Sequence, residues 1–243
     1  TTVNVAAALA QAGKRVLVID LDPQGNASTA LGISHAEGTE GVYEVLIENQ
    51  SLDGVVQKAT SVDGVWCIPS TMDVAGCEIE LVSVEDREFR LRTALRNHTS
   101  EEPYDFILID CPPSLGLLTI NAFTAATEVL IPIQCEYYAL EGLTQLMRNI
   151  TLIQAHLNPQ LRVSTILMTM YDARTRLSAQ VAAEVRSHFG DLVLKTSVPR
   201  SVRISEAPSH GETVLTYDPI SVGALSYREV AVELSRQHVP QNL

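Results

Sequence analysis

Two stretches of this sequence decide the fold: Val16-Leu-Val-Ile-Asp-Leu-Asp-Pro-Gln-Gly-Asn26 and Phe106-Ile-Leu-Ile-Asp-Cys-Pro-Pro-Ser114. Each begins with an apolar run rich in β-branched residues, which is typical of a strand buried on both faces of a parallel sheet. Each run ends in aspartate and then breaks at Pro or Gly. Ligands of open α/β sheets bind at the carboxyl ends of the strands. Two acids delivered to that edge therefore indicate a site for a nucleotide and a metal ion.

The rest of the chain alternates predicted strands with predicted helices. Besides the strands above, we expect strands over 64–69, 128–134, 163–169 and 192–197. Helices are expected up to Gly13 and over 72–95 (broken near 85–86), 115–126, 139–156, 178–189 and 221–236, with a loop and short helices over 23–60. This alternation predicts a doubly wound, mostly parallel α/β sheet flanked by helices. Without a repeat or a Ser/Gly/Pro-rich linker, residues 1–243 are expected to form a single domain.

Composition excludes some classes of protein. No apolar run approaches the roughly 18 residues of a membrane-spanning helix. The four cysteines show no C-x-x-C spacing, which argues against zinc or iron–sulfur ligation and fits a reducing cytosol. We interpret three of them as small buried hydrophobes.

Charge is divided unevenly along the chain. The net charge is −12, which is unusual for a protein that binds nucleic acid. Residues 1–150 carry 8 Lys and Arg against 21 Asp and Glu, whereas residues 151–243 carry 9 against 8. Basic residues of the second part gather in two short segments, at 174–176 and 195–203.

Three further motifs accompany the two strands: Gly116-Leu-Leu-Thr-Ile-Asn121, Gln134-Cys-Glu-Tyr-Tyr-Ala-Leu-Glu-Gly142 and Pro199-Arg-Ser-Val-Arg-Ile-Ser-Glu-Ala-Pro-Ser-His-Gly211. Together the motifs resemble the ParA/Soj-type partition ATPases, a deviant Walker A branch of the P-loop NTPases. The resemblance runs from Thr1 to about Arg236. It implies a cytoplasmic, nucleoid-associated ATPase that uses ATP and Mg²⁺ in chromosome or plasmid segregation.

The phosphate loop of that family, Lys-Gly-Gly-Val-Gly-Lys-Thr-Thr, is not in this sequence. If Asn4 matches the family's Asn six residues after the loop lysine, that lysine and the Mg²⁺-binding threonine fall before residue 1. Thr1 and Thr2 are then not their counterparts. We interpret the sequence as an N-terminally truncated piece that lacks the first strand. A chain truly beginning at Thr1 is expected to be unstable, at ~1–3 kcal/mol for each buried backbone group left unpaired, and inactive alone.

The resemblance also implies roles for the residues of the two Asp-tipped stretches. Asp110 is expected to hold Mg²⁺ through water. Asp22 is our candidate for the catalytic residue, which positions the attacking water near the metal. We place it on the same strand face as Asp20, which would support the phosphates or Mg²⁺. Gln24 and Pro112 belong to loops that resemble the nucleotide-sensing switch segments.

Binding roles in the second part of the chain follow from the same resemblance. Thr169 and Pro199 lie where relatives hold adenine, Pro199 through its carbonyl. Arg174 and Arg203 match arginines that relatives use, as dimers, to bind DNA without reading its sequence, and Lys195 lies in the same basic region.

Other residues have ordinary interpretations. The tyrosines at 137 and 138 match a family block that we interpret as core or dimer packing. His210 is interpreted as a loop histidine.

The resemblance implies a cycle in which ATP binding favours a homodimer that binds DNA nonspecifically. A second phosphate-loop lysine would reach across that dimer. A ParB-type partner would then stimulate hydrolysis and release the dimer. Two alternatives remain. A MinD-like membrane-cycling ATPase is disfavoured because the tail over 233–243 contains Pro240 and no apolar stripe, and we expect no membrane binding. The other is a noncatalytic DNA-binding or regulatory module without a phosphate loop.

Overall fold

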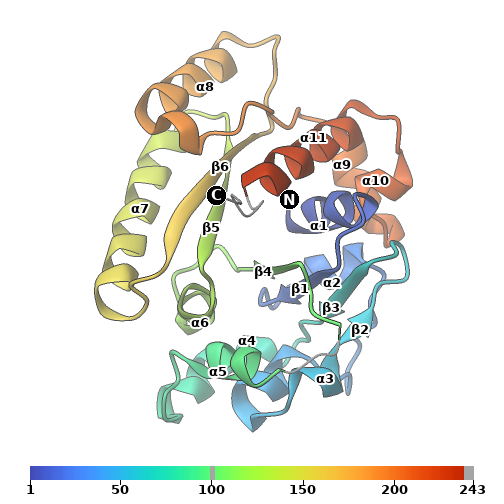
Figure 1. Cartoon of the computed structure of the whole chain (residues 1–243), viewed down its shortest axis with the longest axis vertical. Helices are drawn as coiled ribbons and strands as arrows, with labels where there is room; N and C mark the ends of the chain where they lie inside the picture. Colours follow the sequence, from blue (N-terminus) through green and yellow to red (C-terminus); the bar gives the residue numbers. More distant parts are fainter. Residues whose placement is uncertain (99–101, 238–243) are drawn as a thin grey trace, which may run out of the picture.

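A computed structural model describes residues 1–98 and 102–237 and shows helices packed on both faces of a central sheet (Figure 1). β1 (Val16–Asp20) pairs in parallel with β3 (Val65–Ile68) on one side and with β4 (Phe106–Asp110) on the other. β2 (Gln57–Lys58) joins β3 antiparallel, which makes the sheet mixed. β5 (Glu128–Gln134) and β6 (Arg162–Thr169) form a second parallel pair. The predicted α/β fold is confirmed.

Helices follow most strands. They are α1 (Thr2–Gln11), α2 (Asn26–Ala30), α3 (Leu52–Val55), α4 (Val74–Glu80), α5 (Arg90–Asn97), α6 (Leu117–Ala125), α7 (Ala139–His156), α8 (Arg176–Phe189), α9 (Val202–Glu206), α10 (Val214–Tyr217) and α11 (Val222–Gln237). Shorter turns are η1 (Glu44–Glu48), η2 (Leu81–Ser83), η3 (Gly190–Leu192) and η4 (Ala207–His210). Gly13 ends the first helix in the left-handed conformation, at φ 82°, as its position predicts.

Alternate residues of β1 build the cores on the two faces of the sheet. Val16 and Val18 pack with α1 and α11, whereas Leu17 and Ile19 pack with α4, α5 and α6. All four side chains are fully buried, as expected for a central parallel strand. A third core lies between β5, β6 and the helices α7 and α8.

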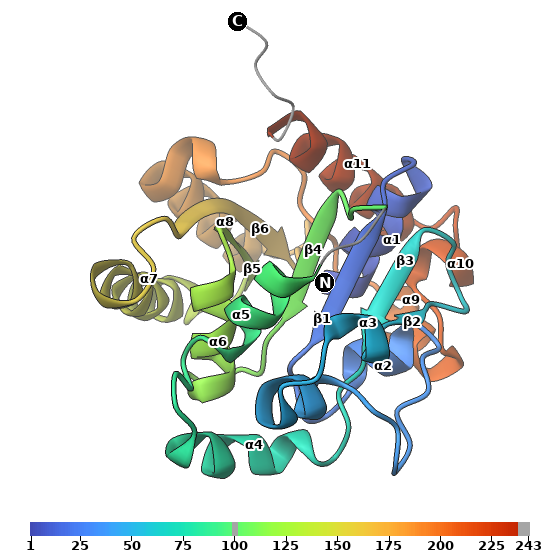
Figure 2. The same ribbon diagram turned by 60° about the horizontal axis from the view of Figure 1, so that its bottom comes forward.

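β4 differs from the expectation that it is buried on both faces. Ile107 is 41% exposed, and the other residues of the strand are only half-buried. The reason is its position: in the described part of the chain β4 is the last strand of its sheet, and β5 belongs to a separate pair (Figure 2). A further strand could pair with the free edge of β4 or with that of β5. The strand that we expect ahead of Thr1 stays a prediction.

The strand expected over 192–197 does not form. Val193 makes a single bridge to Ile166, directly after the turn η3. The backbone N–H groups of Lys195 and Thr196 donate instead to the carboxylate of Glu233 on α11, each at 2.9 Å. A side chain thus takes the donors that a neighbouring strand would need.

The cysteines behave as small core residues. Cys67, Cys77 and Cys135 are buried and Cys111 is half-buried, and all four are free thiols. Burial raises the pKa of the Cys111 thiol to about 12, and the neighbouring Asp110 adds to the effect. No described helix combines the length and the apolar character required to cross a bilayer.

Asn121, the last residue of one predicted motif, joins α6 to α5. Its amide NH₂ donates to the carbonyl of Arg87 at 2.7 Å, and its side-chain oxygen accepts from the backbone N–H of Leu91 at 3.1 Å. The side chain is fully buried. A short polar residue here satisfies backbone groups that the turn between η2 and α5 leaves unpaired.

Asn121→Ala is therefore expected to lower the free energy of unfolding by about 3 kcal/mol, because it strands buried backbone groups. Denaturant unfolding measures this. The control Gln145→Ala, on the exposed side of α7, should change it by less than ~0.5 kcal/mol. An equal, small effect of both substitutions would contradict the role of Asn121.

Candidate functional site

The parallel register of β1 and β4 brings two acids together at the carboxyl edge of the sheet. Asp20 pairs with Asp110 as the last residues of the two strands. The first turn of α1 reaches the same place, where the Thr2 hydroxyl donates a hydrogen bond to the Asp110 carboxylate. The first turn of α1 thus lies beside a carboxylate at the edge of the sheet where ligands of α/β proteins bind.

Asp20 has a structural role that its fully buried side chain makes possible. Its carboxylate accepts from the N–H and the hydroxyl of Ser28, at 2.8 and 2.7 Å, and from the N–H of Asp22 at 3.2 Å. Burial raises the pKa of Asp20 to about 6 against these hydrogen bonds, which lower it, and Asp110 raises it further. Asp20 therefore fixes the loop between β1 and α2.

Asp22 does not lie on the strand face of Asp20, in contrast to the expectation. β1 ends at Asp20, and the chain then turns, with the N–H of Gly25 donating to the carbonyl of Asp22 at 2.9 Å. Gly25 takes the left-handed conformation that this turn needs, at φ 61°. The Asp22 carboxylate is partly exposed and accepts from the N–H of Gln24 at 3.0 Å, while the Gln24 side chain is exposed.

The loop after β4 carries the second predicted switch segment. Pro112 is half-buried, and the following residues to 115 are exposed at the edge of the sheet. Gly116 then begins α6, and Thr119 anchors the loop by donating its hydroxyl hydrogen to the carbonyl of Ser114 at 2.6 Å. The loop is thus held at its ends and open in its middle.

The acids at this edge of the sheet suit Mg²⁺, which shares its ligands between protein, water and substrate, better than a metal ion that only protein side chains hold. Within residues 1–98 and 102–237, no group of three or more His, Cys, Asp or Glu side chains is arranged to hold a metal ion. Mg²⁺ commonly takes one or two carboxylates and fills its other positions with water and substrate phosphates. Asp110, through water, and the nearby Asp22 would hold such an ion, since one oxygen of Asp20 accepts from Ser28 and the other from the N–H of Asp22.

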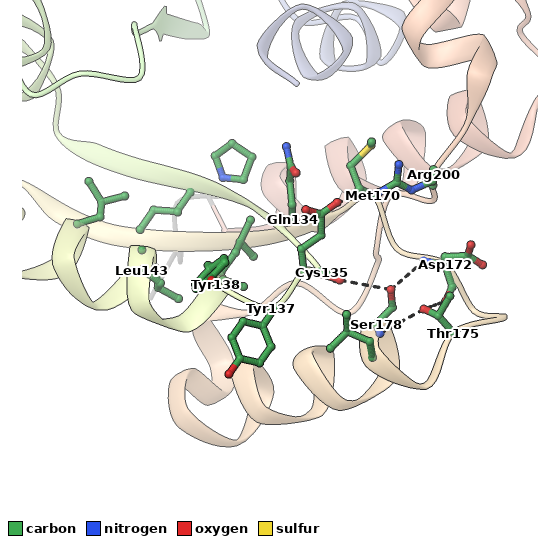
Figure 3. Close-up of a pocket in the computed structure, with 18 residues that line it drawn as sticks. Gln134, Cys135, Tyr137, Tyr138, Leu143, Met170, Asp172, Thr175, Ser178 and Arg200 are labelled. Atoms are coloured by element: carbon green, nitrogen blue, oxygen red, sulfur yellow. Dashed lines mark hydrogen bonds and ion pairs between the residues drawn. The ribbon is translucent and has the colours of Figure 1, made fainter.

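Thr169 and Pro199 lie at the carboxyl end of the other strand pair. The hydroxyl of Thr169 donates to the carbonyl of Ile133 at 3.1 Å, and Pro199 forms a bridge with Tyr171. Beside them a cavity of about 810 Å³ opens between β5, α7 and α8, with Gln134, Met170 and Arg200 in its wall (Figure 3). The residues that line this cavity include neither Asp20, Asp22 nor Asp110.

Tyr137 and Tyr138 are not core residues. Both are largely exposed at the rim of this cavity, with their rings edge to face and 5.1 Å between centroids. The interpretation as core packing is therefore wrong, and dimer packing stays a prediction. His210 does lie in a turn, where it stacks on Tyr217.

Each predicted DNA-binding residue has an acidic neighbour. Arg174 makes a two-pronged contact with Asp172, at 2.9 and 2.8 Å. This contact lowers the pKa of Asp172 to about 2. Arg203 pairs with Glu206 at 3.2 Å and with Asp218 at 3.3 Å. Lys195 lies beside Glu233, to which its backbone N–H donates.

Sequence reasoning missed two residues of these sites. Ser28, eight positions after Asp20, gives no motif signal, because only the folded loop brings it under the strand end. Arg200 stands in the sequence only as part of the basic cluster. It pairs with Glu136 at 2.8 Å and so links the segment after β5 to the segment before α9.

The fold and this edge define an α/β nucleotide-binding protein, and comparisons with known proteins identify its family. The model of a family described as "AAA domain" matches residues 1–163. The sporulation initiation inhibitor protein Soj of Bacillus subtilis is 52% identical over 235 residues, covering 97% of this chain and 92% of Soj. The chromosome partitioning protein ParA of Caulobacter vibrioides is 49% identical over 96% of this chain and 87% of ParA.

Solved structures agree on the fold. Cobyrinic acid a,c-diamide synthase from Mycobacterium smegmatis, with bound ADP and magnesium, superposes with a TM-score of 0.83 at 35% identity, over 97% of this chain and 87% of that one. The cell division ATPase MinD of Pyrococcus furiosus, at 23% identity and a TM-score of 0.77 over 97% and 92%, shares the fold. The chain has the fold of the P-loop NTPases. It belongs to the ParA/Soj family of chromosome partitioning ATPases.

Ser28→Ala removes one donor to the Asp20 carboxylate. A hydrogen bond to a charged group contributes about 1.5–3 kcal/mol, so we expect the free energy of unfolding to fall by about 2 kcal/mol at pH 8. The effect should shrink at pH 5, below the pKa of about 6 for Asp20, because the carboxylate is then protonated. Urea unfolding at both pH values measures this.

The exposed Ser34→Ala serves as the control and should change stability at neither pH. A loss for Ser28→Ala that is the same at pH 5 and pH 8 would show that the hydroxyl does not act through the ionised Asp20.

Proposed function

We propose that this protein is a partition ATPase whose ATP-bound dimer binds DNA nonspecifically on the nucleoid. A ParB-type partner bound at a centromere-like site stimulates hydrolysis of ATP to ADP and phosphate, which releases the dimer. The observation that carries this proposal is the pairing of Asp20 and Asp110 beneath the first turn of α1. Close relatives named as partitioning ATPases support it.

Each acid of this edge has its own task in the proposed reaction. Phosphoryl transfer requires mainly positioning and charge neutralisation. Bound Mg²⁺ supplies the positive charge that neutralises the phosphates. Asp110 would hold Mg²⁺ through water and Asp22 would orient the attacking water, while Asp20 keeps the loop in place through Ser28. The partial exposure of Asp22 leaves its carboxylate accessible to water and to the metal.

We propose that the adenine base binds at the ends of β5 and β6, near Thr169 and the Pro199 carbonyl. Both lie next to residues of the cavity wall, Met170 and Arg200. The Thr169 hydroxyl is already engaged within the sheet, so its contribution to the base is expected to come from packing.

Asp22→Ala is expected to abolish ATP hydrolysis but to keep ATP-dependent dimerisation, because it removes the group that orients water without touching Asp110. Phosphate release and sedimentation of the protein made from its complete gene measure the two effects. Ser34→Ala, at an exposed position outside the two loops, is the control and should keep hydrolysis. Unchanged turnover in Asp22→Ala would remove Asp22 from the catalytic role.

The proposed DNA contacts come from cations that exchange an acidic partner for phosphate. The Arg174 guanidinium is exposed and held by Asp172, and Arg203 is held by two acids on neighbouring turns. Salt screens ion pairs that lie at the surface, and phosphates of DNA can replace the carboxylates. Lys195, also exposed, adds a third positive charge.

Arg174→Glu combined with Arg203→Glu should weaken binding to all DNA sequences and reduce the slope of log K against log salt by about 0.9 for each phosphate that is no longer neutralised. Asp172→Asn should act in the opposite direction and tighten binding, because it frees Arg174 from its competing carboxylate. Fluorescence anisotropy with duplex DNA over a salt series measures both.

Arg96→Glu with Arg148→Glu carries the same change in net charge on other, exposed positions and is the matched control. If it weakens DNA binding as much as the Arg174 and Arg203 pair, net charge explains the result and the assignment of this face is wrong.

The exposed tyrosine pair supports the proposed dimer. Tyr137 and Tyr138 stand at the rim of an open cavity whose lining also includes the exposed Leu177. Aromatic and aliphatic side chains presented together are typical of the core of a protein interface. We place the ATP-dependent dimer contact on this side of the molecule.

The MinD-like alternative is less well supported. α11 turns its apolar residues Tyr227, Val230 and Leu234 into the core against α1, so they are not available to a membrane. Residues 238–243 of the predicted tail lie outside the described residues. The noncatalytic alternative would be favoured if the protein from its complete gene bound DNA equally with and without ATP.

A further inference from the structure

The helix α4 has apolar side chains on two opposite sides. Val74, Cys77 and the following Leu81 face the core and are fully buried. Met72, Ile79 and Val82 are 78%, 79% and 60% exposed. Ile79 lies on α4, Val82 follows it in η2, and Met72 stands in the turn just before α4, where it lines the same surface. A surface helix normally carries polar residues on its outer side, so this outer stripe indicates a binding surface.

A shallow groove crosses this outer stripe. It has a volume of about 420 Å³ and is lined by Tyr43, Met72, Asp73, Gly76 and Glu80. Gly76 lines the groove without a side chain, and a Cβ there would meet the Glu80 carboxylate at 3.1 Å. The Tyr43 hydroxyl donates to the Glu80 carboxylate at 2.9 Å, which orients that acid at the rim. The groove therefore combines apolar walls with carboxylates at its margin.

The charge of the surrounding segment is strongly one-sided. Residues 37–86 hold eleven Asp and Glu against Lys58 alone, a net charge of −10 in a chain whose total is −12. Such a segment attracts cationic partners and repels a second copy of itself or an anionic membrane. The chemistry that complements it is a row of Lys or Arg beside an apolar stripe.

The inner side of α4 contacts the loop that follows β4. The carboxylate of Glu78 packs against Gly116, in space that a Cβ at position 116 would need. Gly116 is the N-cap of α6 and closes the loop that begins after Asp110. One oxygen of Glu78 is buried without a hydrogen-bond partner. A shift of α4 would therefore move the carboxylate of Glu78 against the end of this loop.

We propose that the outer face of α4 and η2 is the docking surface for a basic amphipathic segment of a partner protein. Its apolar side chains would cover Met72, Ile79 and Val82, and its Lys or Arg side chains would pair with Asp73 and Glu80. Docking would shift α4, and the contact of Glu78 with Gly116 would pass this shift to the loop that ends at Gly116. This inference rests on the proposed function only for the role of the partner as a stimulator of hydrolysis.

The test is a titration of the nucleotide-free protein, made from its complete gene, into a fluorescent 18-residue peptide with Leu and Lys at helical spacing. A peptide of the same composition with the pattern scrambled is the probe control. Ile79→Lys with Val82→Lys should weaken binding of the patterned peptide by about tenfold or more. Ile220→Lys with Val222→Lys makes the same exchanges at exposed positions of another surface and should leave binding unchanged.

Thermal unfolding first establishes that both double variants are folded. Equal binding of the scrambled peptide, or equal affinities of the two double variants, would overturn the docking surface. Loss of self-association in the Ile79 and Val82 variant, seen by sedimentation, would identify a second copy as the occupant and also overturn it.

Hydrogen exchange tests the transmission. The peptide should change exchange over 112–120, and Glu78→Ala should reduce that change while the peptide still binds. Unchanged exchange contradicts the transmission through Glu78.

Basal ATP hydrolysis separates this inference from the proposed function. The Ile79 and Val82 variant should hydrolyse ATP as the unmodified protein does. Failure of peptide binding with intact hydrolysis would reject the docking surface alone, and absence of hydrolysis with intact peptide binding would reject the proposed function alone.

Discussion

The parallel pairing of β1 with β4 is the constraint on which the rest of the site depends. It places the carboxylates of Asp20 and Asp110 side by side at one edge of the sheet. Two neighbouring acids there are costly unless each has partners. Asp20 is paired internally through Ser28, whereas Asp110 faces the first turn of α1. The same pairing thus produces one acid that builds the loop and one that is directed toward ligand.

Local ion pairs organise the second part of the molecule in a different way. Arg174, Arg200 and Arg203 each contact an acid close to a strand end or a short helix. These pairs are exposed and contribute little to stability. They hold the cations in place. In the proposed function, DNA binding depends on nucleotide because the dimer brings two such basic surfaces together. It does not arise from the charge of one chain.

Much of the fold could be predicted from the sequence. The bounds of β5 and α7 agree with the structure, because each has a strong apolar period and clear ends. The failures have physical causes. Residues 192–197 begin with three apolar residues like a strand, yet Glu233 takes the backbone donors of Lys195 and Thr196. The exposure of β4 depends on which strands lie beside it, which its own five residues do not encode.

In the candidate site, too, some features could be predicted from the sequence and others only from the folded chain. Asp110 was predictable because a carboxylate at the end of an apolar run is conspicuous. The turn that separates Asp22 from the face of Asp20, and the hydrogen bonds of Ser28, required the folded loop. The exposed positions of Tyr137 and Tyr138 depend on how α7 begins at the sheet edge, so the sequence pattern alone assigned them wrongly.

The most direct test of the account is calorimetric titration of ATP into the protein made from its complete gene, with Mg²⁺ and with chelator, for the unmodified protein and Asp110→Asn. The account predicts that Mg²⁺ strengthens ATP binding by the unmodified protein and that Asp110→Asn loses most of this gain. A variant that keeps the full Mg²⁺ dependence would contradict the central claim that the edge formed by β1 and β4 holds the metal-bound nucleotide.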